Sequence, residues 1–466
     1  MNILVINICL RPESPVKLFP VGLGYITTAM KNAGFDFDLL DINAYRYTDG
    51  QIEQFIRGRK YDVICMGTVV TGYRIIKSLA ALIKKCHPYS KIIVGNTVAT
   101  SVFDTLLRRT KVDIAVIGEG EETIVDILRK LSESKPLEEV CGICFMKDGN
   151  VVCTPPRPLI KDISSLPFMN YSLFDLEIYI DGTKQRINDP LPIPREEIRA
   201  LQVSIARGCI AKCTFCYHIF QDMPYRRRTS ESIVTEIKSL IEKYSINFVI
   251  FWDDLALSSK KHTLEFVEKI LNEKAKFYWM ANCRPNLFDD EADMPMIENM
   301  KEAGCLGLCY GLESADSNIL REMKRRIPVN QFSKQTRLLQ KAGLQTWTTV
   351  VFGYPQETPE TIKKTFDACI ENNIYPSTGY LLPLPGSQMY DYAVRHGFIE
   401  DEESYLLRLG DRQDLRVNMT QMSDEEFAAH VVNGLQRCNE KLNLGLEKDK
   451  LIKTQYYRGA SQSKSF

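Results

Sequence analysis

The sequence predicts an α/β protein in which a doubly wound parallel sheet precedes a partial (β/α)6 barrel and a helical C-terminal region. Three observations predict this class. Short apolar runs alternate with amphipathic segments over residues 1–132, a proline-rich stretch interrupts the pattern, and the alternation resumes at residue 199 with longer spacing. At 466 residues the chain is too long for one ordinary domain, so we expect two or three.

The first region, residues 1–135, contains five candidate strands. Nearly continuous apolar strands separated by helices are typical of a parallel sheet that is covered on both faces, and the region resembles a flavodoxin-like domain. In such sheets ligands bind beyond the carboxyl ends of the strands. Small, polar or glycine residues follow four of the five runs, as a site for a large cofactor requires. The runs are residues 2–7, 35–41, 62–67, 91–95 and 113–118.

Residues 136–198 are less regular and hold eight prolines, so we interpret them as a linker between two domains. Within the linker, the segment VCGICFMKDGNVVCTPP is typical of a hairpin that turns at residues 148–150. Two cysteines of this segment, Cys141 and Cys144, have the spacing of a zinc knuckle, but they could equally be strand residues.

The third region, residues 199–390, contains six candidate strands that are separated by helical patterns. Six strands in β/α series predict a barrel of the TIM type that stays open on one side, which would suit a bulky substrate. Active residues of such barrels lie at the carboxyl ends of the strands. Residues 391–466 are expected to be polar and helical. The candidate barrel strands are residues 200–206, 247–253, 276–282, 306–313, 344–353 and 377–383.

Composition and charge argue against several classes of protein. The formal net charge is zero, which gives no support for a nucleic-acid or membrane-surface partner. No stretch of about 18 apolar residues is present, so we expect no membrane span, and the first residues lack the basic segment of a signal peptide. Fourteen cysteines without an export signal indicate a reducing, cytoplasmic location, where clustered cysteines seldom form disulfides.

Three cysteines, Cys209, Cys213 and Cys216, lie within one short stretch, SIARGCIAKCTFCYHIF. Thiolates favour soft metals such as zinc, copper(I) or iron–sulfur clusters. A cubane cluster normally takes four cysteines, so three would leave one iron open to an outside ligand. A zinc site that is completed by His218 is the competing interpretation, although zinc ligands usually come as pairs from two separate loops.

The spacing C-x3-C-x2-C, with Phe215 directly before the third cysteine, resembles the signature of the radical S-adenosylmethionine (SAM) enzymes. The resemblance implies a [4Fe–4S] cluster on Cys209, Cys213 and Cys216, with the amino and carboxylate groups of SAM on the open iron. One electron then cleaves the sulfonium and gives a 5′-deoxyadenosyl radical that abstracts hydrogen. The protein has to hold this radical beside its target and exclude water.

Later segments resemble the SAM-binding parts of the same enzymes. Asp253 and Asp254 end the second barrel strand and would approach the SAM amino group. Glu313, which follows the fourth strand, would approach the ribose, and Arg325 would approach the SAM carboxylate, for which a cation is a suitable partner. Gly353, which follows the fifth strand, would let the backbone approach the adenine.

Each of these assignments has a plainer alternative. The two aspartates could cap a helix or lie in a solvated turn, Gly353 could lie in an ordinary turn, and Glu313 and Arg325 could belong to a solvated helix face. The sequence does not separate Arg325 from its neighbours Lys324 and Arg326 as the partner of the carboxylate. Three further arginines, in the segment YRRRTSES, could face the cluster or begin a solvated helix.

A flavodoxin-like domain in front of a radical SAM barrel resembles the cobalamin-binding class of these enzymes. The segment PVGLGYITTAMKNAG, the glycine of VGNTVAT and the turn GEGEETI match that class. No Asp-x-His-x-x-Gly segment is present, so we expect no histidine below cobalt. The alternative is a scaffold that has lost its ligand. Candidate cobalamin contacts are Thr68, Gly95, Thr97, Gly118 and Gly120.

These resemblances imply a cobalamin-dependent radical SAM methyltransferase that methylates a carbon, or phosphorus, centre of a small molecule. One SAM would feed the radical, another would remethylate cobalamin, and a donor such as flavodoxin or ferredoxin would supply electrons. Two alternatives stay open: a cyclase or rearrangement enzyme that uses both cofactors without net methyl transfer, and a zinc-bearing binding protein. The sequence assigns no catalytic residue and does not identify the substrate.

Overall fold

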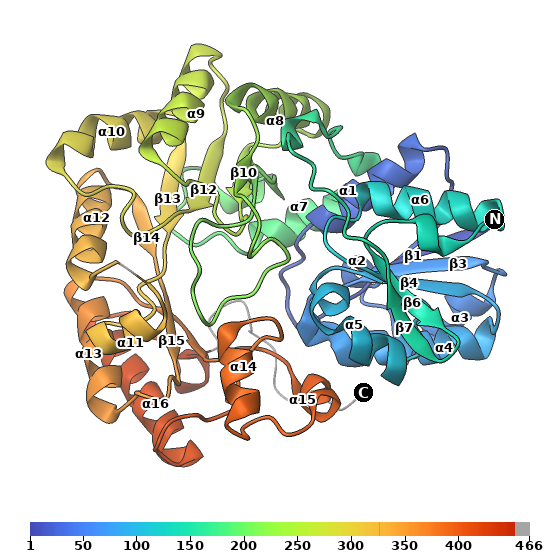
Figure 1. The fold of residues 1–466 in the computed structure, drawn as a ribbon. Coiled ribbons are helices and arrows are strands. Elements are labelled where there is room, and N and C mark those ends of the chain that lie inside the picture. The colour runs from blue at the N-terminus through green and yellow to red at the C-terminus, as the bar shows by residue number, and fades with distance from the viewer. Residues whose placement is uncertain (326, 453–466) are drawn as a thin grey trace.

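The computed structural model describes residues 1–325 and 327–452, which form two facing parts, each built on a parallel sheet (Figure 1). The N-terminal part contains a sheet of seven strands in the order β2-β1-β3-β4-β5-β6-β7. The first five of these strands are parallel. They are β1 (Ile3–Asn7), β2 (Asp38–Asp41), β3 (Val63–Gly67), β4 (Lys91–Gly95) and β5 (Ile114–Val116).

Helices cover both faces of this sheet because successive residues of its strands point to opposite sides. On β1, Ile3 and Val5 pack with α1 and α6, whereas Leu4 and Ile6 pack with α3, α4 and α5. Both faces are therefore apolar, as the continuous runs predicted. The helices are α1 (Val21–Asn32), α3 (Asp49–Arg57), α4 (Tyr73–Cys86), α5 (Thr97–Arg109) and α6 (Glu121–Ser132).

The predicted hairpin is present as β6 (Ile143–Lys147) and β7 (Asn150–Cys153), but it does not lie in a separate linker. Strand β6 pairs antiparallel with β5, so the hairpin extends the first sheet. Cys144 and Cys153 stand opposite each other in its register and form a disulfide, contrary to the expectation that cysteines stay reduced. Cys144 is therefore not available as a metal ligand together with Cys141.

The second part is an incomplete barrel of parallel strands with six strand positions. Strands β14-β13-β12-β11-β8 form one sheet, and β15 and β16 continue beyond it. Thr348 separates β14 from β15, and its hydroxyl accepts from the Leu312 N–H at 3.0 Å. The strands are β8 (Ala200–Gln202), β11 (Phe248–Phe251), β12 (Tyr278–Asn282), β13 (Cys305–Cys309), β14 (Gln345–Trp347), β15 (Thr349–Phe352) and β16 (Ser377–Tyr380). This confirms the predicted fold class.

Local sequence explains where the barrel helices begin and end. Thr229 caps the first of them, α8, by accepting from the Ser232 N–H at 3.2 Å. Gly304 has a φ of +89°, and a Cβ there would lie 2.1 Å from the Phe277 carbonyl oxygen, so only glycine fits. The outer helices are α8 (Ser230–Tyr244), α9 (Lys260–Asn272), α10 (Met294–Glu302), α11 (Ser317–Glu322), α12 (Val329–Lys341) and α13 (Pro359–Glu371).

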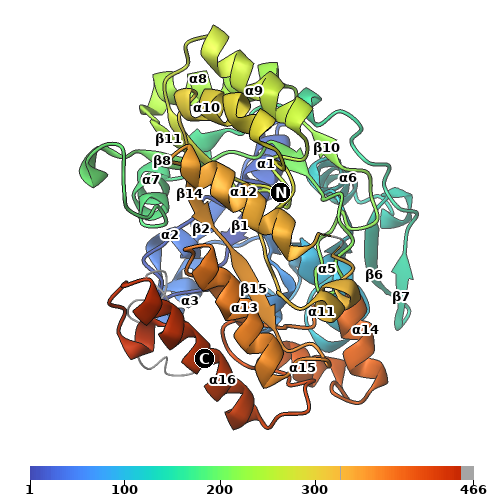
Figure 2. The same ribbon diagram turned by 90° about the vertical axis from the view of Figure 1, so that its left-hand side faces the viewer.

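The C-terminal region is helical, as predicted, and it contacts both parts of the molecule. Figure 2 shows α16 alongside α13 of the barrel. Glu403 of α15 accepts from the Tyr73 hydroxyl at 3.0 Å and pairs with Lys77, both of which belong to α4. The helices of this region are α14 (Gln388–Arg395), α15 (Glu402–Arg408) and α16 (Asp424–Lys441). The domain divisions at residues 135, 198 and 390 stay a prediction.

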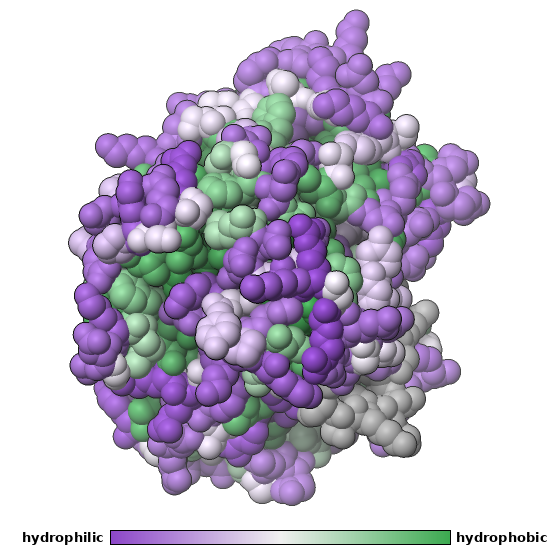
Figure 3. Space-filling model, turned by 90° about the vertical axis from the view of Figure 1, so that its right-hand side faces the viewer, coloured by the Kyte–Doolittle hydropathy of each residue, from purple (hydrophilic) through white to green (hydrophobic). Residues whose placement is uncertain are grey.

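The described residues contain no helix that is long and apolar enough to cross a membrane. On the face shown in Figure 3, hydrophilic residues form most of the outline and hydrophobic residues show between them.

Candidate functional site

The carboxyl ends of the two parallel sheets border one cavity of about 570 Å³. This placement follows from the β/α architecture, in which loops after the strands carry the binding residues. The first part contributes several glycines among apolar residues, and the barrel contributes polar and apolar side chains. The first set includes Gly67, Gly95, Gly118 and Gly120, and the second includes Ser204, Arg207, Asp253 and Asp254.

The glycines at the edge of the first sheet leave this side of the cavity open. A Cβ at Gly95 would meet only Val116 Cβ, at 3.9 Å, so a larger side chain would project into the cavity. A Cβ at Gly120 would lie 2.8 Å from Ile26 Cδ1. Gly118 has a φ of +78°, which favours glycine. Three of the five predicted cobalamin contacts therefore come together in one surface that could accept a large flat ligand.

Thr68 and Thr97, the other two predicted contacts, are not among the described residues that line this cavity. Thr97 begins α5, and its hydroxyl accepts from the Val70 N–H at 2.8 Å. Thr68 is 5% exposed, and its side chain lies where a Cβ on Gly72 would be. Both threonines serve the local fold of the loop after β3, which the sequence pattern could not distinguish from ligand binding.

The three cysteines lie on an irregular loop whose ends are joined by a short antiparallel ribbon, β9 (Ala206–Arg207) and β10 (Arg226–Arg227). Cys209 is half-buried, Cys213 is buried and Cys216 is exposed. The Ala211 N–H donates to Cys209 Sγ at 3.4 Å. Burial is the main reason why the pKa of the Cys209 thiol is raised. Its thiolate form therefore needs a cation or a metal beside it.

The cysteine loop carries three soft thiolate donors, which suit an iron–sulfur cluster. Within residues 1–325 and 327–452, no group of three or more His, Cys, Asp or Glu side chains converges on one ion. His218, the proposed fourth zinc ligand, instead has Nδ1 at 3.5 Å from Asp254 Oδ2. A cubane places each thiolate on a different iron, so it does not require convergence on one point. Three cysteines on one loop therefore fit a cluster better than zinc.

Asp253 connects two barrel strands at the edge of the cavity. Its Oδ1 accepts from the Ser204 hydroxyl at 2.6 Å, and its Oδ2 accepts from the Ile205 N–H at 2.8 Å. Burial raises the pKa of Asp253 to about 6. The helix-cap and solvated-turn alternatives are therefore wrong for this residue. Asp254 lines the cavity beside His218. Its carboxylate is therefore better placed than that of Asp253 to accept a hydrogen bond from a ligand amino group.

Glu313 and Arg325 form a buried pair beside the cysteines, so the solvated-helix alternative is wrong. Arg325 Nη1 lies 3.6 Å from Glu313 Oε1 and 4.0 Å from Cys213 Sγ. The Thr349 hydroxyl donates to the Glu313 carboxylate at 3.1 Å. Lys324 turns away and donates to Gln388 Oε1 at 2.7 Å. Arg326 lies outside the described residues, and of the other two candidates only Arg325 faces the cysteine loop.

Gly353 lies away from this cavity. Its φ is +118°, and its N–H donates to Glu357 Oε2 at 3.2 Å. A Cβ there would meet Leu381 Cβ at 3.4 Å. Gly353 therefore lets β15 pack closely against the end of β16, and an adenine contact at this residue stays a prediction.

Sequence reasoning missed Thr214, which lies between the cysteines and anchors their loop to the barrel. Its hydroxyl donates to the Glu322 carbonyl oxygen at 2.9 Å and lies 2.7 Å from the Tyr354 hydroxyl. Its backbone N–H donates to the Met323 carbonyl oxygen at 3.1 Å. A single threonine carries no periodic signal, so only the fold shows this role.

Two of the three arginines of YRRRTSES, Arg226 and Arg228, are buried, so the solvated-helix interpretation is wrong for them. Arg227 is half-buried, with Nη1 at 3.9 Å from Glu265 Oε2. Arg228 pairs with Glu236 inside the barrel wall, and Arg226 pairs with Glu119 of the first part. In the ribbon β9–β10, Arg226 stands opposite Arg207. The opposite charge of the turn GEGEE was the available signal, because buried cations need carboxylate partners.

Comparisons with known proteins agree with this architecture. The Radical SAM superfamily matches residues 203–369, and the B12 binding domain matches residues 9–128. An uncharacterized methyltransferase from Pyrococcus horikoshii is 25% identical over 410 residues, which cover 86% of this chain and 85% of that relative. An anaerobic magnesium-protoporphyrin IX monomethyl ester cyclase from Cereibacter sphaeroides is 25% identical over 358 residues, which cover 74% of this chain and 55% of that relative.

A solved structure shares the fold over most of the chain. It is the radical SAM methyltransferase TsrM from Kitasatospora setae with cobalamin and a [4Fe–4S] cluster bound, with a TM-score of 0.66 and 18% sequence identity. The likeness covers 85% of this chain and 78% of that chain. The two family matches fall on the two parts whose strand ends border the cavity. The chain therefore contains a B12-binding domain followed by a radical SAM domain.

Proposed function

We propose that this chain is a cobalamin-dependent radical SAM methyltransferase that acts on a carbon, or phosphorus, centre of a small molecule. The observation that carries the proposal is the shared cavity, in which the glycine edge of the B12-binding domain faces Asp254 beside the cysteine loop. A methyl carrier and a radical source must reach the same substrate atom, and such steps depend on close alignment. One cavity that both domains border meets this requirement.

In this proposal the cysteine loop holds the cluster through Cys209, Cys213 and Cys216. When bound, the cluster with SAM supplies a radical that abstracts hydrogen, and cobalamin supplies the methyl carrier. Arg325 brings a cation next to Cys213, where the SAM carboxylate needs a charge-assisted partner. Asp254 is the candidate acceptor for the SAM amino group.

The B12-binding domain would hold the corrin against Gly95, Gly118 and Gly120, where bulkier residues would fill the space. The described residues that line the cavity include no histidine. The proposal therefore contains no histidine ligand to cobalt. A flavodoxin or ferredoxin as electron donor and a cytoplasmic location stay predictions.

Anaerobic expression with cobalamin tests the proposal. The purified protein should contain cluster iron, sulfide and corrin absorption together. The substrate is to be inferred from the enzymes that the neighbouring genes encode. With this substrate, the product should gain one methylene, and S-adenosylhomocysteine and 5′-deoxyadenosine should form in equal amounts. Protein that takes up iron and sulfide but no cobalamin would contradict the methyl-transfer proposal.

A cyclase or rearrangement enzyme is the second candidate, and the similarity to the protoporphyrin ester cyclase supports it. The chain spans about half of that relative, so the likeness leaves the rest of that protein without a counterpart here. The product mass distinguishes the two candidates. An unchanged mass or a loss of hydrogens, without S-adenosylhomocysteine, would favour the second one.

A further inference from the structure

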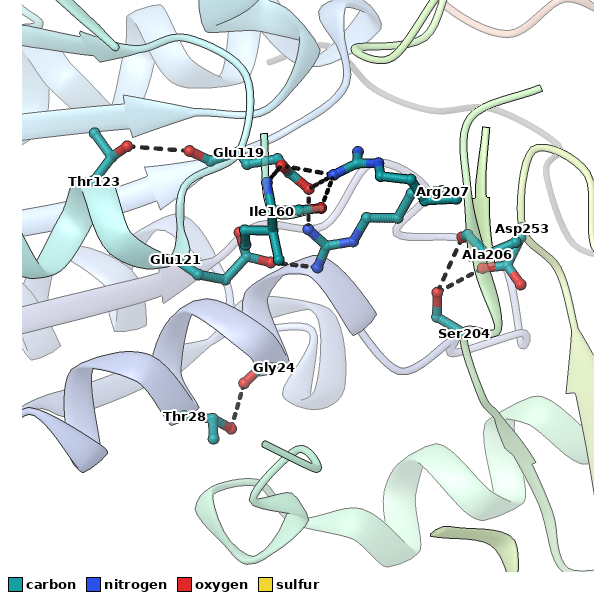
Figure 4. A network of polar contacts seen from close by, with 11 residues as sticks. Gly24, Thr28, Glu119, Glu121, Thr123, Ile160, Ser204, Ala206, Arg207 and Asp253 are labelled. Atoms are coloured by element: carbon teal, nitrogen blue, oxygen red, sulfur yellow. Dashed lines mark hydrogen bonds and ion pairs between the residues drawn. The ribbon is translucent and has the colours of Figure 1, made fainter. Parts of the chain in front are cut away.

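Buried ion pairs join the cysteine loop to the B12-binding domain (Figure 4). Arg207 lies two residues before Cys209, and its guanidinium pairs with Glu119 through Nη1 and with Glu121 through Nη2. The side chains of Arg207, Glu119 and Glu121 are 11%, 4% and 10% exposed. Both glutamates lie where α6 begins, in the turn that lines the cavity. A single side chain therefore links the start of the cysteine loop to the predicted cobalamin surface.

Glu119 is the centre of this network. It accepts from Arg226 Nη1 at 2.9 Å and from the Ile160 N–H at 2.9 Å, in addition to its pair with Arg207. Arg226 stands directly opposite Arg207 in the β9–β10 ribbon, so the fold aims both guanidinium groups at the same carboxylate. Two arginines and two glutamates balance in charge, which a buried cluster of ions requires. Arg226 Nη1 also donates to the Ile160 carbonyl oxygen at 2.6 Å, whereas its Nε and Nη2 are buried without a hydrogen-bond partner among the described residues.

Aromatic rings hold Arg207 in this orientation. Its guanidinium carbon lies 5.3 Å from the ring centre of Tyr25 in α1 and 6.0 Å from that of Phe220 in the cysteine loop. These contacts restrict the side chain from both domains. The planar fork can therefore meet two carboxylates at once, which an ammonium group cannot do with the same geometry.

The location of Arg207 suggests that this residue does more than hold the two domains together. The turn that contains Glu119 and Glu121 includes Gly118 and Gly120, against which the corrin would lie. If this turn moved, the ion pairs would move Arg207 with it. Cys209, which follows Arg207 by two residues, would then be displaced as well. Because small misplacements of reacting groups slow catalysis strongly, the distance between the two cofactors needs such a support.

We propose that Arg207 is a positioning residue that fixes the cysteine loop relative to cobalamin through its fork to Glu119 and Glu121. This inference rests on the proposed function, because it assumes that both cofactors bind. Arg207 acts through Cys209 on one side and through the turn of residues 118–121 on the other. It is not assigned a contact with substrate or SAM.

The test uses the full chain, reconstituted with cluster, cobalamin and SAM and frozen with the cluster reduced and cobalt in the Co(II) state. Electron paramagnetic resonance then reports the spin–spin interaction between the two centres. Arg207→Gln should weaken and broaden this interaction and raise the cobalamin Kd about tenfold, in the range of couplings between contacting residues. Arg207→Lys keeps the charge but loses the fork, so it should give an intermediate result.

A matched control distinguishes a loss of positioning from a general weakening of the contact between the domains. Lys77→Met removes another ion pair between the first domain and the rest of the chain, the pair with Glu403. This variant should lose stability but keep the spin–spin interaction. If Arg207→Gln does not fold, Glu121→Gln removes one arm of the fork and should change the interaction in the same direction.

The outcomes distinguish this inference from the proposed function. A wild-type chain that binds no cobalamin would overturn both. A wild-type chain that binds both cofactors, with the same interaction and cobalamin Kd in the Arg207 and Glu121 variants, would overturn only the role of Arg207.

Discussion

The cysteine loop is held in different ways near Cys209, at its first end, and near Cys213, at a segment that we call the barrel end. Near Cys209 the contacts are ionic and cross between domains, from Arg207 to Glu119. Near Cys213 the loop is anchored by neutral hydrogen bonds within the radical SAM part, from Thr214 to Glu322 and Tyr354, although the Arg325–Glu313 pair lies beside it. Buried ion pairs resist displacement because a lone partner is costly, whereas neutral hydrogen bonds fix local shape. We therefore expect the first end to set the distance to cobalamin and the barrel end to set the shape of the cluster site.

The largest effect is expected for Cys213→Ala, which removes a thiolate at the end held by the barrel. The variant should lose nearly all cluster iron, because the cluster has only three cysteines on this loop to bind it. Cys86→Ala is the control, since Cys86 is a half-buried cysteine of α4. Iron and sulfide analysis after anaerobic reconstitution provides the measurement, and a full cluster in the Cys213 variant would refute the ligand assignment.

The barrel end should also respond to pH through Glu357. Burial raises the pKa of Glu357 to about 7, and this carboxyl accepts from the Gly353 N–H directly before Tyr354. The native state keeps a proton that the unfolded chain has lost. The free energy of unfolding should therefore fall by about 3 kcal/mol as the pH rises from about 4.5 to 7, and stay level above that.

Glu357→Gln provides the measurement for this pH effect. The free energy of unfolding of this variant should lack this part of the pH dependence. The difference in unfolding free energy between the two proteins should therefore change between pH 5 and 7. Cobalamin affinity should be the same in both proteins, because Glu357 lies at the barrel end. Parallel curves over this range would show that Glu357 does not titrate as expected.

Thr214→Val should loosen the barrel end alone. The substitution leaves the Glu322 carbonyl and the Tyr354 hydroxyl without their partner, at a cost of about 2 kcal/mol. The Cys216 N–H, which donates to the Cys213 carbonyl oxygen, reports this locally. Its hydrogen exchange should become roughly thirtyfold faster. Arg207→Gln should leave this exchange unchanged, and an equal effect of both substitutions would contradict the independence of the two ends.

The smallest expected effect compares the neighbouring Arg325 and Lys324. Arg325→Gln should raise the SAM Kd about tenfold, as expected for the loss of a charge-assisted hydrogen bond, and leave the cobalamin Kd unchanged. Lys324→Gln is the matched control, because Lys324 turns away from the cysteines. Anaerobic calorimetry with SAM measures both variants. A change in SAM affinity for Lys324→Gln alone would reassign the partner of the carboxylate.

Much of the fold followed from local pattern. The strands of the first sheet match the apolar runs closely, as β4 (Lys91–Gly95) shows, because a strand buried on both faces needs an uninterrupted run. Gly95, Gly118 and Gly120 were predicted as cobalamin contacts from the resemblance to the cobalamin-binding class, and all three line the cavity. Thr68 and Thr97 were also predicted there, but their hydroxyl groups serve the loop after β3.

The sequence by itself determined two parallel sheets, the three cysteines on one loop and the superfamily to which that spacing belongs. Only the tertiary structure decided that Arg226 and Arg228 are buried, that Arg325 rather than Lys324 faces the cysteines, and that Arg207 meets Glu119. The physical reason is the sequence separation over which the two kinds of interaction act. Periodicity and turn chemistry act over a few residues, whereas a buried charge finds its partner across distant parts of the chain, here 88 residues away.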